Sequence, residues 1–129
     1  MTASTAQIAF YLRGAFEARG SVSIARSGSG SVTGRISIDT TTLSPDLEAL
    51  FGAPTVMRGY AKPTYRYLTG SRAEVAVIVT LITFAHPAPE RLRELIILSA
   101  CVEAATEAER IAAMDGLRAL RAKRGTNAD

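Results

Sequence analysis

The first forty residues change from a helical to an alternating hydrophobic pattern. Residues 6–18 carry apolar side chains at helical spacing, and Gly20 is a suitable C-terminal breaker. Residues 21–26 and 32–40 instead alternate polar and apolar positions, on either side of the Ser-Gly-Ser-Gly-Ser segment at 27–31. This pattern predicts a helix followed by a two-stranded hairpin with one buried face.

The next segment repeats the order of helix and hairpin. Residues 44–51 begin with Ser-Pro-Asp and end before a glycine, as a short capped helix does. Residues 55–60 and 64–69 predict a second hairpin around Ala-Lys-Pro. Residues 72–84 predict a helix, although their β-branched side chains would also suit a strand.

The C-terminal part is predicted to be helical. A His-Pro-Ala-Pro break at 86–89 precedes two alanine-rich helices at 90–105 and 107–123. The order of helix, two strands, helix, two strands and helices indicates an α+β fold. We expect one domain at 1–125 and a flexible tail at 126–129.

Composition excludes several classes of protein. The chain has 129 residues, of which 47% are hydrophobic, so it can bury a core. Cys101 is the only cysteine, which excludes an intrachain disulfide and a cysteine metal cluster, and no cofactor is expected. No apolar run reaches the roughly 18 to 20 residues of a membrane span, and no secretory signal pattern is present. We therefore expect a cytoplasmic protein.

Positive charge is concentrated on the predicted strands. The net charge is +3, and residues 21–69 contain five basic and three acidic residues. Two of those acids, Asp46 and Glu48, belong to a helix start, so Asp39 is the only acid on the strands. The distribution favours an anionic partner but does not by itself identify one.

The segment Leu-Arg-Gly-Ala-Phe-Glu-Ala-Arg-Gly at 12–20 resembles the motif of the LAGLIDADG homing endonuclease family. Four positions match the motif, two are conservative replacements and three depart from it, namely Leu12, Gly14, Ala18 and Gly20, then Phe16 and Glu17, then Arg13, Ala15 and Arg19. The later elements follow in the family's order, including Phe51-Gly52, and the resemblance covers residues 5–105. It implies an αββαββα fold in which a four-stranded antiparallel sheet forms a saddle with helices on one face, plus an extra C-terminal helix.

The resemblance also implies how the chain assembles. In the family the motif helix packs against a second copy of itself, and small residues four apart allow close approach. Only one motif is present here, so a two-fold homodimer is expected. Its predicted interface residues are Tyr11, Gly14, Ala15 and Ala18.

The motif lacks the acid with which the family binds its catalytic metals. Arg19 occupies that position, and a guanidinium cannot ligate Mg²⁺. We therefore predict no metal site and no catalytic residues. An active nuclease that uses Glu17 as a displaced ligand stays an alternative.

The family lays its sheet into the DNA major groove, which admits a β-ribbon. Alternation assigns Val22, Ile24, Ile36 and Ile38 to the core, so polar residues between and beyond them are the candidates for DNA contact. They are Arg19, Ser21, Ser23, Arg26, Ser27, Arg35, Ser37, Asp39, Arg58, Tyr60, Lys62, Thr64 and Arg66. Asp39 could accept from a cytosine amino group or pair with one of the arginines.

The sequence thus predicts a homodimer that binds a near-palindromic double-stranded DNA site without cutting it. A transcriptional regulator such as a repressor would suit such binding. The two alternatives are the active Mg²⁺-dependent nuclease and a decayed remnant that binds another protein.

Overall fold

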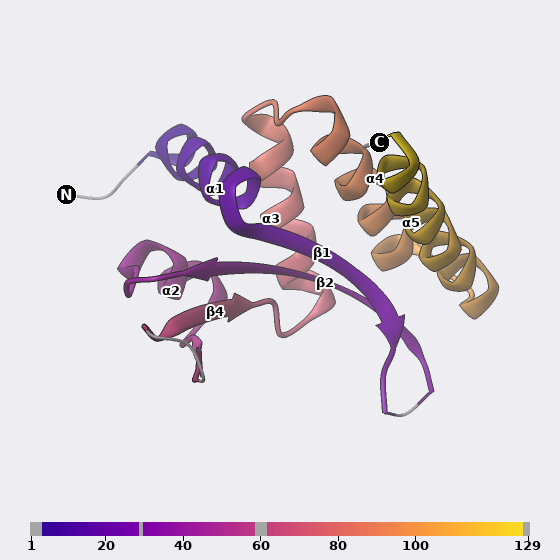
Figure 1. Cartoon of the computed structure of the whole chain (residues 1–129), viewed down its shortest axis with the longest axis horizontal. Helices are drawn as coiled ribbons and strands as arrows, with labels where there is room; N and C mark the ends of the chain where they lie inside the picture. Colours follow the sequence, from indigo (N-terminus) through magenta and orange to yellow (C-terminus); the bar gives the residue numbers. More distant parts are fainter. Residues whose placement is uncertain (1–3, 29, 59–61, 128–129) are drawn as a thin grey trace.

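A computed structural model describes residues 4–28, 30–58 and 62–127, with side chains described up to Lys123 in the last helix. The elements follow the predicted order, with three helices after the second hairpin (Figure 1). They are α1 (Thr5–Arg19), β1 (Gly20–Arg26), β2 (Val32–Thr40), α2 (Pro45–Phe51), β3 (Thr55–Met57), β4 (Thr64–Leu68), α3 (Arg72–Phe84), α4 (Pro89–Glu103) and α5 (Glu107–Asn127).

Serine side chains fix the starts of the first three helices. Ser4 accepts a hydrogen bond from the Gln7 backbone amide, and the Gln7 side chain accepts from the Ser4 amide, which completes a capping box. Ser44 and Ser71 cap α2 and α3 in the same way through one hydroxyl each. These local signals explain why the helix starts could be read closely from sequence.

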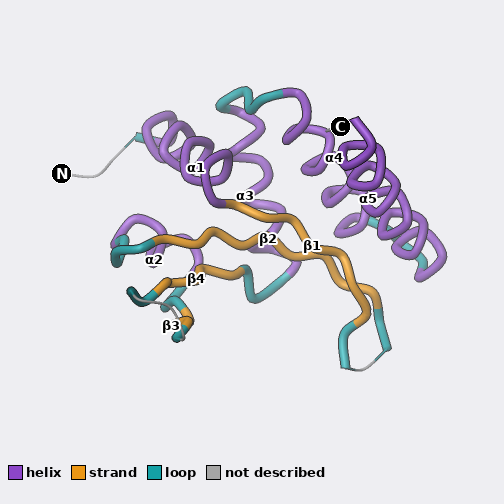
Figure 2. The backbone as a smooth tube through the Cα atoms, viewed as in Figure 1, coloured by secondary structure: helices purple, strands orange, loops and turns teal. Residues whose placement is uncertain are grey.

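The four strands form one antiparallel sheet in the order β1-β2-β4-β3. All seven residues of β1 pair with β2, whereas β4 pairs only with residues 37–40 of β2. The β1–β2 hairpin therefore extends well beyond the rest of the sheet, and Figure 2 shows it curving away from α1 toward its tip.

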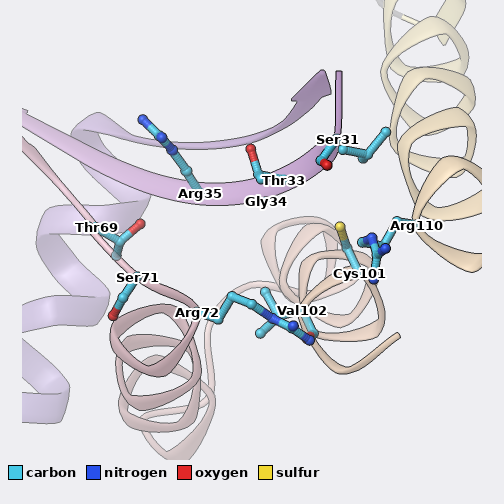
Figure 3. Close-up of a pocket in the computed structure, with 12 residues that line it drawn as sticks. Ser31, Thr33, Gly34, Arg35, Thr69, Ser71, Arg72, Cys101, Val102 and Arg110 are labelled. Atoms are coloured by element: carbon cyan, nitrogen blue, oxygen red, sulfur yellow. The ribbon is translucent and has the colours of Figure 1, made fainter. Parts of the chain in front are cut away.

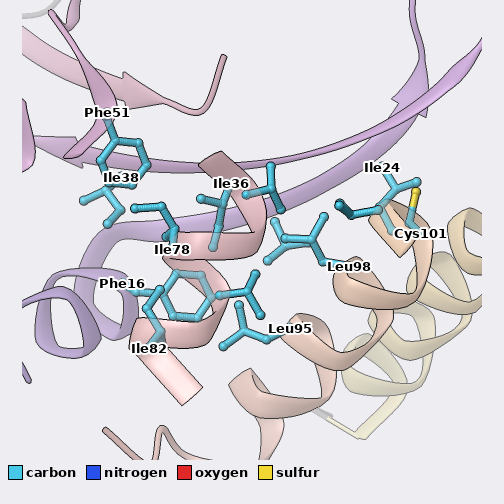
Figure 4. Close-up of a cluster of buried hydrophobic side chains, with 14 of the residues drawn as sticks. Phe16, Ile24, Ile36, Ile38, Phe51, Ile78, Ile82, Leu95, Leu98 and Cys101 are labelled. Carbon is cyan, nitrogen blue, oxygen red and sulfur yellow. The ribbon is translucent and has the colours of Figure 1, made fainter. Parts of the chain in front are cut away.

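The helices cover one face of this sheet. Side chains from β1 and β2, including Ile24, Ile36 and Ile38, pack against α1, α3 and α4 (Figure 4). Tyr67 of β4 is fully buried, lies edge-on to Phe51 and accepts a hydrogen bond from the Ser44 backbone amide through its hydroxyl. The other face of the sheet carries no helix (Figure 1).

The structure confirms the predicted fold class and changes two boundaries. The helix at 72–84 is present despite its β-branched residues, because burial of Val75, Ile78 and Ile82 outweighs the weak strand propensity. β3 ends at Met57 and not near residue 60, and α5 continues to Asn127. Within the described ranges, no helix is both long and apolar enough to cross a membrane.

Candidate nucleic-acid interface

The sheet face without helices, called the outer face below, is built mainly from small polar residues and arginine. Residues paired across an antiparallel sheet project to the same side, so the register defines this face. It joins Ser21 to Ser37, Ser23 to Arg35, and Asp39 to Arg66. The intervening residues Val22, Ile36 and Ile38 are fully buried, as the alternation predicted.

Asp39 and Arg66 form a bidentate ion pair on the outer face. Arg66 donates from Nε to Oδ1 at 2.9 Å and from Nη2 to Oδ2 at 3.1 Å. The arginine side chain is 42% exposed, so the pair is accessible to a ligand. Of the two roles that the sequence left open for Asp39, the structure shows pairing with an arginine. The carboxylate therefore neutralises Arg66 and fixes its orientation.

Arg35 is exposed and lies on β2, four residues before Asp39. Ser23 stands opposite it on β1, and no ion pair to Arg35 is found among the described side chains. Arg35 is therefore an exposed cation on the outer face, in the middle of the β1–β2 hairpin. Thr64 also belongs to the outer face, because it lies two residues before Arg66 on β4.

Other predicted DNA contacts lie elsewhere. Arg26 pairs with the buried Val32, so the register places it on the helix side, where it donates to the Gly30 carbonyl. The structure thus corrects its expected grouping with Ser21 and Ser23. Ser27 is half-buried and belongs to the turn, since its amide donates to Ser31.

The residues predicted for the second hairpin are only partly brought together. Arg58 and Lys62 are exposed and lie between β3 and β4, outside both strands. Tyr60 falls outside the described residues. Contact of Arg58 and Lys62 with DNA stays a prediction.

Sequence reasoning missed five outer-face residues. Thr33 continues the odd-numbered positions of β2, and Thr55 pairs with Arg66, so alternation and register were the signals for both. Ala25, Met57 and Leu68 share the face by the same register. They were overlooked because they are apolar, yet apolar side chains can contact the thymine methyl group.

The junction between α1 and β1 is tightly packed. A Cβ on Gly20 would lie 2.6 Å from the Phe16 carbonyl oxygen and 2.4 Å from its ring, so this position requires glycine for space. Arg91 of α4 donates to the carbonyls of Phe16 and Gly20 and stacks on the Phe16 ring, 4.2 Å from the guanidinium carbon to the ring centroid. These contacts hold the end of α1 and the start of β1 against α4.

The side chains at this junction do not fit a divalent cation. The Oε1 atom of Glu17 accepts a hydrogen bond from the Ala88 amide at 2.9 Å, which directs the carboxylate toward the start of α4. Arg19 is exposed and adds a positive charge at the helix end. No group of three acidic, histidine or cysteine side chains suited to a metal occurs in the described part of the chain.

One exposed face of α1 carries aromatic and small side chains. Phe10 and Tyr11 are 49% and 42% exposed, and Gly14 and Ala18 are exposed beside them. A Cβ on Gly14 would meet no atom within 4 Å, so the fold of one chain does not require glycine there. Ala15 is half-buried and packs partly against the core of its own chain.

A cleft of about 340 Å³ lies at the edge of β2 beyond the end of β4 (Figure 3). Two of its arginines are engaged, because Arg72 donates to the Val102 carbonyl and Arg110 pairs with Glu107. Thr33 and Arg35 of the outer face also line this cleft, and Figure 3 shows the Arg35 side chain projecting from β2 away from Cys101 and Arg110.

Two ionisable groups near the cleft are perturbed. Burial raises the pKa of the Cys101 thiol, against the opposing effect of Arg110 and Arg72. The pKa of Glu107 is lowered, first because its carboxylate accepts the Val32 amide hydrogen at 3.0 Å and then because of Arg110. Glu107 therefore ties the start of α5 to the open edge of β2.

Comparison with known proteins identifies this arrangement as a known fold. No family model matches the chain, and neither does any curated protein sequence. Solved structures do match. The homing endonuclease I-CvuI, in complex with an uncleaved DNA target, aligns with TM-score 0.65 and 12% identity over 88% of this chain and 81% of its own. The LAGLIDADG meganuclease I-AabMI bound to uncleaved DNA aligns with TM-score 0.63 and 10% identity over 87% of this chain.

The group I intron-encoded homing endonuclease I-CeuI, complexed with DNA, aligns with TM-score 0.59 and 14% identity over 80% of this chain. The chain spans only 57% of I-CeuI and 42% of I-AabMI. At these identities the likeness establishes the fold. The chain has the fold of the LAGLIDADG homing endonucleases, as the motif at 12–20 predicted.

Proposed function

We propose that this protein is a homodimeric, sequence-specific DNA-binding protein that does not cut DNA and acts as a transcriptional regulator, such as a repressor. The observation that carries the proposal is the outer face of the sheet. It is open to solvent, and its described charged groups are Arg35 and the Asp39–Arg66 pair. The structural neighbours were solved as complexes with DNA, which supports DNA as the partner.

The outer face suits the DNA major groove in its chemistry. Arg35 can donate to the guanine edge or to a phosphate, while the hydroxyls of Ser21, Ser23 and Thr33 can donate or accept. Because Asp39 holds Arg66, that arginine would approach DNA in a fixed orientation, which favours recognition of one base over nonspecific attraction.

The surface of α1 supports a two-fold dimer. Gly14 and Ala18 are small and lie four residues apart on an exposed helix face, flanked by Phe10 and Tyr11. A second copy of α1 could approach this face closely and cover both aromatic side chains. Two copies of the outer face related by two-fold symmetry would then read a near-palindromic site.

We infer the loss of DNA cleavage from the charged residues at the end of α1. At an effective dielectric constant near 20, unit charges about 4 Å apart interact by about 4 kcal/mol, so Arg19 would repel a cation that an acid there would attract. Glu17 is already engaged by the Ala88 amide and would have to leave it to bind a metal. Both features oppose an Mg²⁺ site at the end of α1.

Selection of bound sequences from a random double-stranded DNA pool in the presence of Mg²⁺ tests the proposal. We expect an enriched near-palindrome recovered uncut. Arg35→Ala should weaken binding to the selected site and reduce its salt dependence if Arg35 contacts phosphate. Arg118→Ala is the matched control, since Arg118 is an exposed arginine on α5, in the helical layer, and should leave binding unchanged.

Other outcomes separate the alternatives. Mg²⁺-dependent cleavage that disappears in Glu17→Gln would show an active nuclease and refute the proposal. Absence of any enriched sequence, with no salt-dependent binding, would favour a protein-binding remnant. Sedimentation of Gly14→Leu tests the dimer separately, because a leucine would hold the two α1 helices apart and leave a monomer.

A further inference from the structure

A groove of about 370 Å³ lies between α4 and α5, on the surface that these helices turn away from the sheet. Its described lining is apolar apart from two cations and consists of Arg93, Ile96, Ile97, Gly116, Ala119, Leu120 and Lys123. Ile96 is 59% exposed, whereas Leu95, Leu98 and Leu117 on the opposite sides of the same helices are buried. The groove is therefore not part of the core, and it lies far from the outer face of the sheet.

Gly116 is the feature that makes the groove open. It lies in the interior of α5, where glycine is a poorer helix former than alanine. A Cβ at this position would meet no atom within 4 Å, so packing within the chain does not require glycine. Gly14 on the exposed face of α1 is in the same situation. At Gly116 the missing side chain leaves room for an atom from outside the chain.

The charge at one end of the groove indicates what fits it. α4 and α5 are joined by residues 104–106 and run antiparallel, so Arg93 near the start of α4 lies beside Lys123 near the end of α5. No ion pair to either cation occurs among the described side chains. An apolar floor with two cations at one end is complementary to an apolar helix face with carboxylates at one end.

We propose that the α4–α5 groove binds an amphipathic helix of a partner protein, with an apolar stripe over Ile96, Gly116 and Leu120 and carboxylates toward Arg93 and Lys123. The partner helix would lie against the helical layer, so it could bind while the outer face holds DNA. This inference does not depend on the proposed DNA function, because it concerns a different surface and can be tested without DNA.

The experiment uses the full chain and a displayed library of helical peptides of about 16 residues, which span about 24 Å. Peptides that bind the chain are selected and synthesised, and their affinity is measured by fluorescence anisotropy. We expect the selected peptides to carry apolar residues at helical spacing and aspartate or glutamate clustered at one end. Gly116→Leu should fill the groove and weaken peptide binding at least tenfold without lowering the thermal midpoint. Gly14→Leu, which fills the equivalent space on α1, should leave it unchanged.

Charge reversal provides the second readout. The acidic peptides should bind the double variant Arg93→Glu, Lys123→Glu at least tenfold more weakly than they bind the unmodified chain. Peptides in which lysine replaces the carboxylates should instead bind the double variant more tightly than the unmodified chain. The proposal is overturned if no peptide is enriched, if the enriched peptides bind Gly116→Leu as tightly, or if they are basic or uncharged. It is also overturned if Gly116→Leu, and not Gly14→Leu, abolishes self-association, because a second copy would then occupy the groove.

Discussion

Gly20 ends α1 and begins β1, and replacing it with alanine tests the packing of the junction directly. Its φ of −93° is open to every residue, so backbone strain is not the reason for glycine. The reason is space. A Cβ at this position would lie 2.4 Å from Phe16 Cδ1, 2.6 Å from the Phe16 carbonyl oxygen and 2.7 Å from Phe16 Cα.

The cost follows from which atoms must move. Carbon atoms pack at about 3.5–4.0 Å, so the new methyl group would have to separate from Phe16 by roughly 1 Å. The ring could rotate, but the carbonyl and Cα belong to the last turn of α1. Their movement would strain the bonds that Arg91 donates to the Phe16 and Gly20 carbonyls. Overpacking of this kind costs about 1–3 kcal/mol.

Urea denaturation followed by far-ultraviolet circular dichroism measures this cost. We expect Gly20→Ala to lower the free energy of unfolding by about 1–3 kcal/mol with the same m-value. Gly116→Ala is the matched control, because its methyl group enters open space and glycine is a poor helix former. That variant should gain up to about 1 kcal/mol. All proteins are compared at one concentration, since dimerisation would add to the apparent stability.

A Gly20→Ala protein within about 0.5 kcal/mol of the unmodified chain would refute the packing argument. It would mean that α1 and β1 can separate at the junction at almost no cost. Equal destabilisation of both variants would also refute it, since the loss would then follow from removing any glycine and not from contact with Phe16.

Three further predictions follow from side-chain contacts. The pKa of Glu107 is lowered, so its contribution to stability is complete above the usual glutamate pKa of about 4.3 and is lost as the pH falls through the lowered value. Glu107→Gln should therefore reduce the fall in unfolding free energy between pH 5 and pH 3. Parallel curves of unfolding free energy against pH for the two proteins would contradict this. Cys101 is buried with a raised pKa, so a disulfide reagent should label the native thiol far more slowly than the urea-unfolded thiol, and equal rates would place it at the surface. Asp39→Asn should change stability by less than about 1 kcal/mol, because the pair is partly exposed, but alter the base preference in a DNA selection; an unchanged preference would exclude Arg66 from base recognition.

The alternation of the strands predicted most of the outer face because the side-chain period of a strand is two. Ser21, Ser23, Arg35 and Asp39 were assigned correctly on that basis alone. Arg26 was assigned to the wrong face, because the prediction followed its polarity and not its even-numbered position in the strand. At the end of a strand, a long side chain can lie on the helix side and still reach solvent.

Contacts between distant segments could not be predicted in the same way. Nothing local distinguishes Arg66, which Asp39 binds, from Arg35, which carries no such ion pair, since the choice depends on the register between β2 and β4. The same holds for Arg91, which lies 71 residues from Gly20 in sequence and yet donates a hydrogen bond to the Gly20 carbonyl. Sequence patterns indicate faces, whereas the pairing of elements decides which charged groups meet.

Within residues 12–20, different side chains provide the packing of the junction and the exposed charge at the helix end. Gly20 allows α1 and β1 to pack closely, and the Glu17 carboxylate accepts a hydrogen bond from the Ala88 amide. Arg91 of α4 donates a hydrogen bond to the Gly20 carbonyl. Arg19 takes part in none of these contacts, because its side chain is exposed at the last position of α1. The charge at that position can therefore change from negative to positive without disturbing the packing of the junction.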